Sequence, residues 1–164
     1  MKEECCPKFN PKKWNEKTFI WKNKSFIKET IPTLFHIPFP PMIGNKITKM
    51  MKLISNSNNL DSKKDEILIL FRDLNAFKSE IYISVTDNVS GANNVTLSGT
   101  FIAKTYDGGY NAVPKFVKDM NEYLAQKGKK AKNSDYYIHY AYCPKCAKKF
   151  GNNYMILFAK VKNI

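Results

Sequence analysis

The chain has 164 residues, a length that favours one domain able to bury roughly two-thirds of its unfolded surface. It contains no apolar run long enough to span a bilayer, and its polar first residues do not resemble a signal peptide, so we expect a cytoplasmic protein without membrane contact. The net charge of +13 indicates attraction to anions, but Arg72 is the only arginine, the usual residue for contacts with bases and phosphates. We therefore expect a solvated lysine-rich surface rather than a nucleic-acid partner.

The first half of the chain is predicted to begin with an arm, residues 1–26, that packs on the body of the domain. Apolar residues then alternate between Pro32 and Pro38, which indicates a strand, and a proline-rich loop follows. Farther on, apolar residues recur at helical spacing and then in two extended runs. The predicted elements are a strand, a helix and two strands, at residues 33–37, 43–54, 66–71 and 79–85.

The second half repeats this order with clearer patterning. Asp107, Gly108 and Gly109 offer turn chemistry between a strand and a helix, because glycine reaches positive φ without steric cost. Gly128 is placed to end the helix. The predicted elements are a strand, a helix and two strands, at residues 99–106, 112–126, 135–142 and 153–161.

Two units of the same order predict one α+β domain over residues 27–164, with repeats at 27–90 and 95–162. We expect the two strand–helix–strand–strand units to be related by a pseudo-twofold axis. Together they would form an antiparallel sheet with the helices on one face, leaving the other face to line a ligand groove.

The amino-acid sequence of the second unit resembles that of the GyrI-like (gyrase-inhibitor-like) family. The resemblance rests on Gly99-x-Phe101-x-Ala103 followed by the turn Gly108-Gly109-Tyr110, with Gly109 where many members have proline. It implies a domain made of two such copies, with the ligand held between them and a buried acid that meets cationic drugs.

Three further segments resemble a stand-alone branch of that superfamily, which lacks a DNA-binding domain. They are residues 4–9, 94–99 and 143–151, the last reading CPKCAKKFG. Related stand-alone members open the cyclopropane ring of DNA-alkylating cyclopropanoid natural products with water. Two positions depart from the expected pattern, with Phe77 in place of a tryptophan and Glu80 in place of an aspartate.

Glu80 is the leading candidate for catalysis. Strand alternation places Ile81 and Ile83 on the core face, and Glu80, Tyr82 and Ser84 on the opposite face. A carboxylate among aromatic rings is poorly solvated, so we expect a raised pKa and a usable base near neutrality. The same residue can instead be a counter-ion for a cationic ligand, or an exposed strand acid.

The remaining site candidates are mostly aromatic. Tyr142 is the candidate whose hydroxyl would stabilise charge in a reaction, although either row of the strand 135–142 can face the groove. His36 and His139 are the only histidines and suit either acid–base chemistry or a structural hydrogen bond. The predicted ligand-binding residues are His36, Phe39, Tyr82, Tyr110, Tyr140 and Tyr154.

The four cysteines allow a metal site. Cys143 and Cys146 are spaced as in a zinc-knuckle turn, and a site with four sulfurs would add Cys5 and Cys6. The same spacing occurs in redox pairs, and the thiols can also simply be reduced and structural. We therefore expect no required cofactor, with zinc possible at the cysteines.

These observations lead to three hypotheses of function. The first is a groove for flat aromatic small molecules that hydrolyses cyclopropanoid toxins, with Glu80 acting on water. The second is a protein that sequesters such molecules and releases them intact. The third is a zinc-dependent module that binds nucleic acid or protein through its lysines and the CPKC segment. We expect a monomer or a weak dimer.

Overall fold

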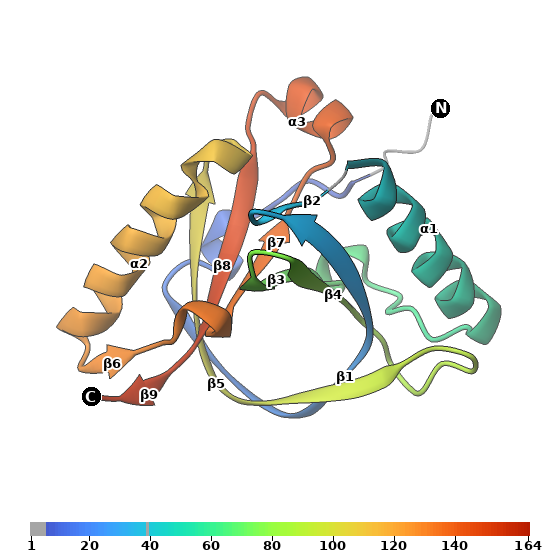
Figure 1. Cartoon of the computed structure of the whole chain (residues 1–164), viewed down its shortest axis with the longest axis horizontal. Coiled ribbons are helices and arrows are strands. Elements are labelled where there is room, and N and C mark those ends of the chain that lie inside the picture. Colours follow the sequence, from blue (N-terminus) through green and yellow to red (C-terminus); the bar gives the residue numbers. More distant parts are fainter. Residues whose placement is uncertain (1–5, 39) are drawn as a thin grey trace. The chain divides into compact units, whose positions relative to one another are not determined.

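The computed structural model describes residues 6–38 and 40–164, which fold into two compact α+β units (Figure 1). The first unit is Trp21–Ser98, and the second combines the residues up to Ile20 with Gly99–Ile164. Two long strands, β1 (Lys17–Leu34) and β5 (Asn94–Asp107), contribute residues to both units. None of the helices in the described part of the chain combines the length and apolar character that a membrane span needs.

The first unit contains an antiparallel sheet in the order β2-β1-β4-β3. Its register places Ile83 of β4 between Ile27 of β1 and Ile69 of β3. The three shorter strands are β2 (Ile37–Pro38), β3 (Ile69–Asn75) and β4 (Lys78–Ser84). A 3₁₀ turn at Lys64–Glu66 precedes β3, so this strand begins three residues later than predicted.

Helix α1 (Pro40–Ser57) covers one face of this sheet (Figure 1). Its buried Met50 and Ile54 pack against isoleucines that β1 and β4 present on that face. The helical spacing of its apolar residues therefore serves burial, and burying such side chains stabilises by roughly 1.5–3 kcal/mol each. The sheet residues of this core include Ile27, Ile31, Ile81 and Ile83.

The predicted strand at 33–37 is wrong in one respect, because a turn interrupts it. β1 ends at Leu34, and Phe35 and His36 adopt φ values of 49° and 67° before β2 begins. Two consecutive positive φ angles are those of a type I′ hairpin turn, for which asparagine and glycine are the usual residues. The turn is held by the His36 N–H, which donates to the Ala76 carbonyl at 2.9 Å. Moreover, residues 17–26, expected in an arm, belong to β1.

The second unit contains an antiparallel sheet in the order β7-β8-β5, with α2 (Val113–Gln126) on one face (Figure 1). Met120 and Leu124 of α2 are fully buried against Leu157 and Ala159 of β8. The other strands are β6 (Lys129–Lys130), β7 (Tyr136–Tyr140), β8 (Tyr154–Lys160) and β9 (Lys162–Asn163), and β6 pairs with β9. A short helix, α3 (Pro144–Phe150), lies between β7 and β8.

The opposite face of this sheet is aromatic. The ring of Phe158, which is fully buried, lies 6.0 Å from the ring of Trp14 and 6.1 Å from that of Phe19. Phe101 and Tyr137 meet edge to face at 5.9 Å. Such ring pairs add stabilisation beyond the area that they bury. The aromatic residues near the N-terminus are therefore part of the second unit's core.

Glycines end two elements in different ways. Gly128 follows α2 with a φ of 68°, which confirms that it ends this helix. Gly108 and Gly109 do not use positive φ, contrary to the prediction. Gly108 is needed for space instead, because a Cβ there would lie 2.7 Å from Cζ of Phe116, whose ring stacks on Tyr106 at 4.5 Å.

The order strand, helix, strand, strand recurs as predicted, in β1-α1-β3-β4 and in β5-α2-β7-β8. Each of these predicted elements exists, and outside the long strands β1 and β5 the ends differ from the prediction by up to four residues. An α+β fold with antiparallel sheets is thus confirmed, and a pseudo-twofold relation between the repeats stays a prediction.

Candidate functional site

The candidate site in the first unit is built around Glu80 on β4, the strand between β1 and β3. Alternation holds as predicted, since Ile81 and Ile83 pack under α1 while Glu80 and Tyr82 lie on the other face. This second face is nevertheless buried. Glu80 is 5% exposed and Tyr82 is 3% exposed, and the Tyr82 ring meets that of Phe26 edge to face.

Three donors surround the Glu80 carboxylate. Nη1 of Arg72, directly opposite on β3, lies 3.1 Å from Oε1, and the Tyr82 hydroxyl donates to the same oxygen at 2.9 Å. Nζ of Lys28 on β1 lies 3.0 Å from Oε2. Lys28 and Arg72 keep 28% and 22% of their side chains exposed, so the cluster reaches solvent through its two cations. One carboxylate and two cations leave this cluster with a net positive charge.

The electrostatics of Glu80 differ from the prediction. Burial raises its pKa, but hydrogen bonds from Lys28 and Tyr82, and the charges of Lys28 and Arg72, outweigh that effect and lower the pKa below the ordinary 4.5. The expected rise was wrong because strand alternation does not reveal which cations stand opposite. Glu80 is therefore a carboxylate at neutral pH, well suited to accept hydrogen bonds and weak as a base.

This lowered pKa predicts how stability depends on pH. The stability contributed by ionised Glu80 should be fully present above pH 4.5 and be lost as pH falls through the folded-state pKa. Relative to Glu80→Gln, which loses the charge on its hydrogen bonds, the wild type should be more stable by about 2 kcal/mol at pH 7, with less difference in acid. Urea unfolding of both proteins between pH 7 and pH 3 measures this, and a constant difference would contradict it.

The other predicted site residues of the first unit lie elsewhere. His36 sits in the exposed β1–β2 turn, where its Nδ1 lies 2.6 Å from Oδ2 of Asp73. Phe77, the departure from tryptophan, is 62% exposed and faces Phe35 at 6.1 Å. Phe39 lies outside the described residues. The structure therefore joins Tyr82 to Glu80 and places His36 in a hydrogen bond with Asp73 at the hairpin turn.

In the second unit, Tyr142 belongs to an aromatic cluster. It is 6% exposed, its ring stacks on Phe150 at 4.8 Å, and Tyr154 lies 6.4 Å away. Its hydroxyl accepts a hydrogen bond from the Phe9 N–H at 2.9 Å. Tyr142 and Tyr154 are thus brought together, and both hold the N-terminal segment through Phe9.

The two rows of β7 can now be told apart. Tyr136 and Ile138 face α2, and the Tyr136 hydroxyl bonds Asn121 of that helix, whereas Tyr137 points to the aromatic face. Burial raises the pKa of Tyr140, and the neighbouring Tyr110 adds to the effect. Tyr110 is 53% exposed. These last two predicted ligand residues therefore lie near each other.

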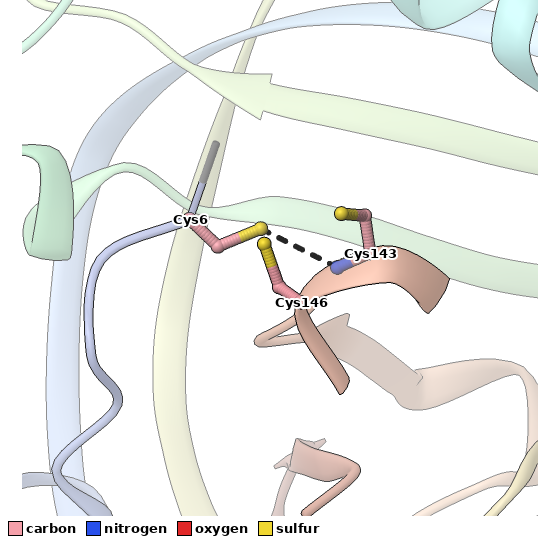
Figure 2. Close-up of side chains that lie close together, drawn as sticks. All are labelled: Cys6, Cys143 and Cys146. Atoms are coloured by element: carbon pink, nitrogen blue, oxygen red, sulfur yellow. Dashed lines mark hydrogen bonds between the residues drawn. The ribbon is translucent and has the colours of Figure 1, made fainter. Parts of the chain in front are cut away.

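Three of the four cysteines lie together in the second unit. The side-chain sulfurs of Cys6, Cys143 and Cys146 all lie within 4.8 Å of one another, although Cys6 is distant in sequence (Figure 2). Cys5 lies outside the described residues. The CPKC segment is not a simple turn, because Cys143 is the N-cap of α3. The arrangement is close enough for the three thiols to bind one metal ion.

Sequence reasoning missed the two cations beside Glu80. From the sequence, Arg72 is notable only as the single arginine, and nothing distinguishes Lys28 from the other lysines. The available clue was the β3–β4 hairpin, because a short turn after Asn75 places Arg72 opposite Glu80. The pairing of β1 with β4, which brings in Lys28, has no comparable local clue.

The comparison with family models decides the family. The sequence matches the family described as bacterial hydrolase over residues 1–161. This chain belongs to that family. The comparison with curated proteins finds no match.

Solved structures show which fold this bacterial hydrolase family member has. The match to the crystal structure of the EcmrR C-terminal domain covers 90% of this chain and 97% of that chain, with a TM-score of 0.66 and 11% sequence identity. The match to the crystal structure of a hydrolase from Listeria innocua covers 91% of this chain and 93% of that chain, with a TM-score of 0.63 and 13% sequence identity. The match to the structure of SAV2435 bound to tetraphenylphosphonium covers 89% of this chain and 93% of that chain, with a TM-score of 0.54 and 15% sequence identity. The fold is that of the GyrI-like superfamily, as predicted.

Proposed function

We propose that this protein binds flat aromatic or hydrophobic small molecules and opens the strained ring of cyclopropanoid toxins with water. The observation that carries the proposal is a buried carboxylate, Glu80, held by three donors beside two partly exposed cations. The family description supports a hydrolytic activity, and the complex of SAV2435 with tetraphenylphosphonium supports the binding of an aromatic small molecule. Destroying a DNA-alkylating toxin in the cytoplasm would protect the cell.

The cluster matches the charges that such a reaction develops. In a cyclopropane conjugated to a carbonyl, the breaking C–C bond delivers its electron pair to the ring system, and negative charge grows on the carbonyl oxygen. The fixed positive charges of Lys28 and Arg72 would stabilise that oxygen. Because Tyr82 is buried while both cations are partly exposed, the two cations are better placed for this role than the tyrosine.

Glu80 would act on the attacking water. Its carboxylate accepts a hydrogen bond from that water and aligns the oxygen with the cyclopropane carbon. As the new C–O bond forms and the C–C bond breaks, the water loses a proton to Glu80. Glu80 then passes this proton to the former carbonyl oxygen of the substrate, which has become negatively charged. The net change is the addition of one water molecule. The low pKa of Glu80 assigns more of the effect to orientation than to proton abstraction.

The same contacts favour a second candidate, a protein that binds without catalysis. Both carboxylate oxygens already have cationic partners, so Glu80 is a poor proton acceptor. Lys28 is exposed enough to swing away, and a cationic aromatic ligand could then take its place at Oε2. This alternative uses the same residues and predicts that the ligand is recovered unchanged.

The test separates the two candidates by the fate of the ligand. A cyclopropane-conjugated dienone is incubated with the protein, and the products are extracted and weighed by mass spectrometry. Hydrolysis adds the mass of one water at a rate well above buffer alone. Recovery of intact ligand with saturable binding would support sequestration instead, and neither binding nor conversion would refute both candidates.

A further inference from the structure

The thiols of Cys6, Cys143 and Cys146 converge from two distant parts of the sequence. Cys6 precedes the first 3₁₀ turn, at Pro11–Lys13, and the other two belong to the start of α3 (Figure 2). Their sulfurs lie within 4.8 Å of one another, and Cys146 is 4% exposed. Sulfurs around one tetrahedral zinc ion are about 3.8 Å apart, a spacing that small side-chain rotations would reach here.

We propose that Cys6, Cys143 and Cys146 bind one Zn²⁺ ion that fastens the N-terminal segment to α3. This inference concerns a site separate from Glu80 and does not depend on the proposed hydrolysis. Thiolate donors are soft ligands that favour zinc among the common divalent cations with closed shells. The fold brings together three such ligands, one more than the CxxC segment provides by itself.

Local structure explains why the two cysteines of CPKC face the same way. Cys143 is the N-cap of α3, with extended φ and ψ of −67° and 163°, and Pro144 follows at the start of the helix. The side chains of an N-cap and of the third helical residue lie on the same side, as in a capping box. Cys146 occupies that third position, so both sulfurs point toward Cys6.

The surroundings suit a bound metal thiolate. The Cys143 N–H donates to Sγ of Cys6 at 3.4 Å, the kind of hydrogen bond that orients a sulfur ligand. Three residues after Cys6, the Phe9 N–H donates to the Tyr142 hydroxyl, which again connects this segment to the end of the sheet. A metal would therefore reinforce a contact that closes a loop of more than a hundred residues.

The experiment begins with the full-length protein, purified reduced and without a metal-binding tag. Zinc content is measured by mass spectrometry, and Co²⁺ is titrated into the metal-free protein to observe thiolate-to-cobalt charge-transfer absorption. We compare the wild type with Cys6→Ser, Cys143→Ser and Cys146→Ser. Lys145→Ala is the matched control, because this exposed residue lies between the two cysteines of α3.

The wild type and Lys145→Ala should hold about one zinc per chain, and each serine variant less than about a tenth of that. Zinc removal should lower the Tm of the wild type by about 10 °C, if the metal is well above its Kd. X-ray absorption on the wild type, which needs no variant to fold, should show at least three sulfurs at about 2.3 Å. A reduced wild type that takes up neither metal, or a Cys146→Ser protein that keeps its zinc, would overturn the proposal.

Discussion

Glu80→Gln should lower kcat/KM for ring opening by about 100-fold or more while the ligand Kd changes by no more than several-fold. Glutamine fills the same volume and can still accept a hydrogen bond from Tyr82, so the shape of the site is retained. It lacks the negative charge that orients water and accepts its proton. Initial rates by mass spectrometry and binding by calorimetry measure the two quantities separately.

The matched control is Glu29→Gln. Glu29 lies on β1 and pairs with Ile81, the residue that follows Glu80 on β4. Its side chain is therefore on the other face of the sheet from Glu80, where its carboxylate contacts Lys46 of α1. It should leave both kcat/KM and Kd unchanged. Unchanged turnover in a folded Glu80→Gln protein would refute the mechanism, even if wild-type hydrolysis had been demonstrated.

Phe158→Ala should destabilise the protein by about 3–5 kcal/mol, corresponding to a fall in Tm of about 10 °C. The ring is fully buried on β8 and contacts Trp14 and Phe19, two residues from the opposite end of the chain. Its removal leaves a cavity between segments that can close on it only in part. Urea unfolding followed by circular dichroism measures the free energy change.

Ile20→Ala is the control for this prediction. Ile20 belongs to the same unit and also loses apolar bulk, but it is 71% exposed and forms no part of the core. Ile20→Ala should change the free energy of unfolding by no more than about 0.5 kcal/mol. Equal losses in the two variants would show that Phe158 does not carry the packing described above.

Much of the fold was predictable because local patterns specify local structure. Apolar residues at helical spacing identified α1 and α2, and Gly128 marked the end of α2 through its left-handed conformation. The hairpin turn at Phe35 and His36 was missed because neither residue type indicates positive φ. Its conformation depends on hydrogen bonds to the neighbouring β3–β4 turn, which are contacts between distant parts of the chain.

The site was predictable only in part, for the same reason. Alternation placed Glu80 and Tyr82 on one face of β4, and the structure confirms that they interact. The sign of the Glu80 pKa shift depended on Lys28, which arrives from β1 through strand pairing rather than through sequence spacing. Burial and ion pairing act in opposite directions on that pKa, so the outcome needs the positions of both partners.

Patterning by itself determined the α+β class and the repeated strand–helix–strand–strand order, and particular short motifs carried the resemblance to the GyrI-like family. These properties follow from periodicity and short motifs, which are readable within windows of a few residues. Tertiary structure alone decided that two cations hold Glu80 ionised and that Cys6 joins Cys143 and Cys146. Both depend on side chains brought together by strand pairing and chain closure, and the free energy of such contacts has no counterpart in local sequence.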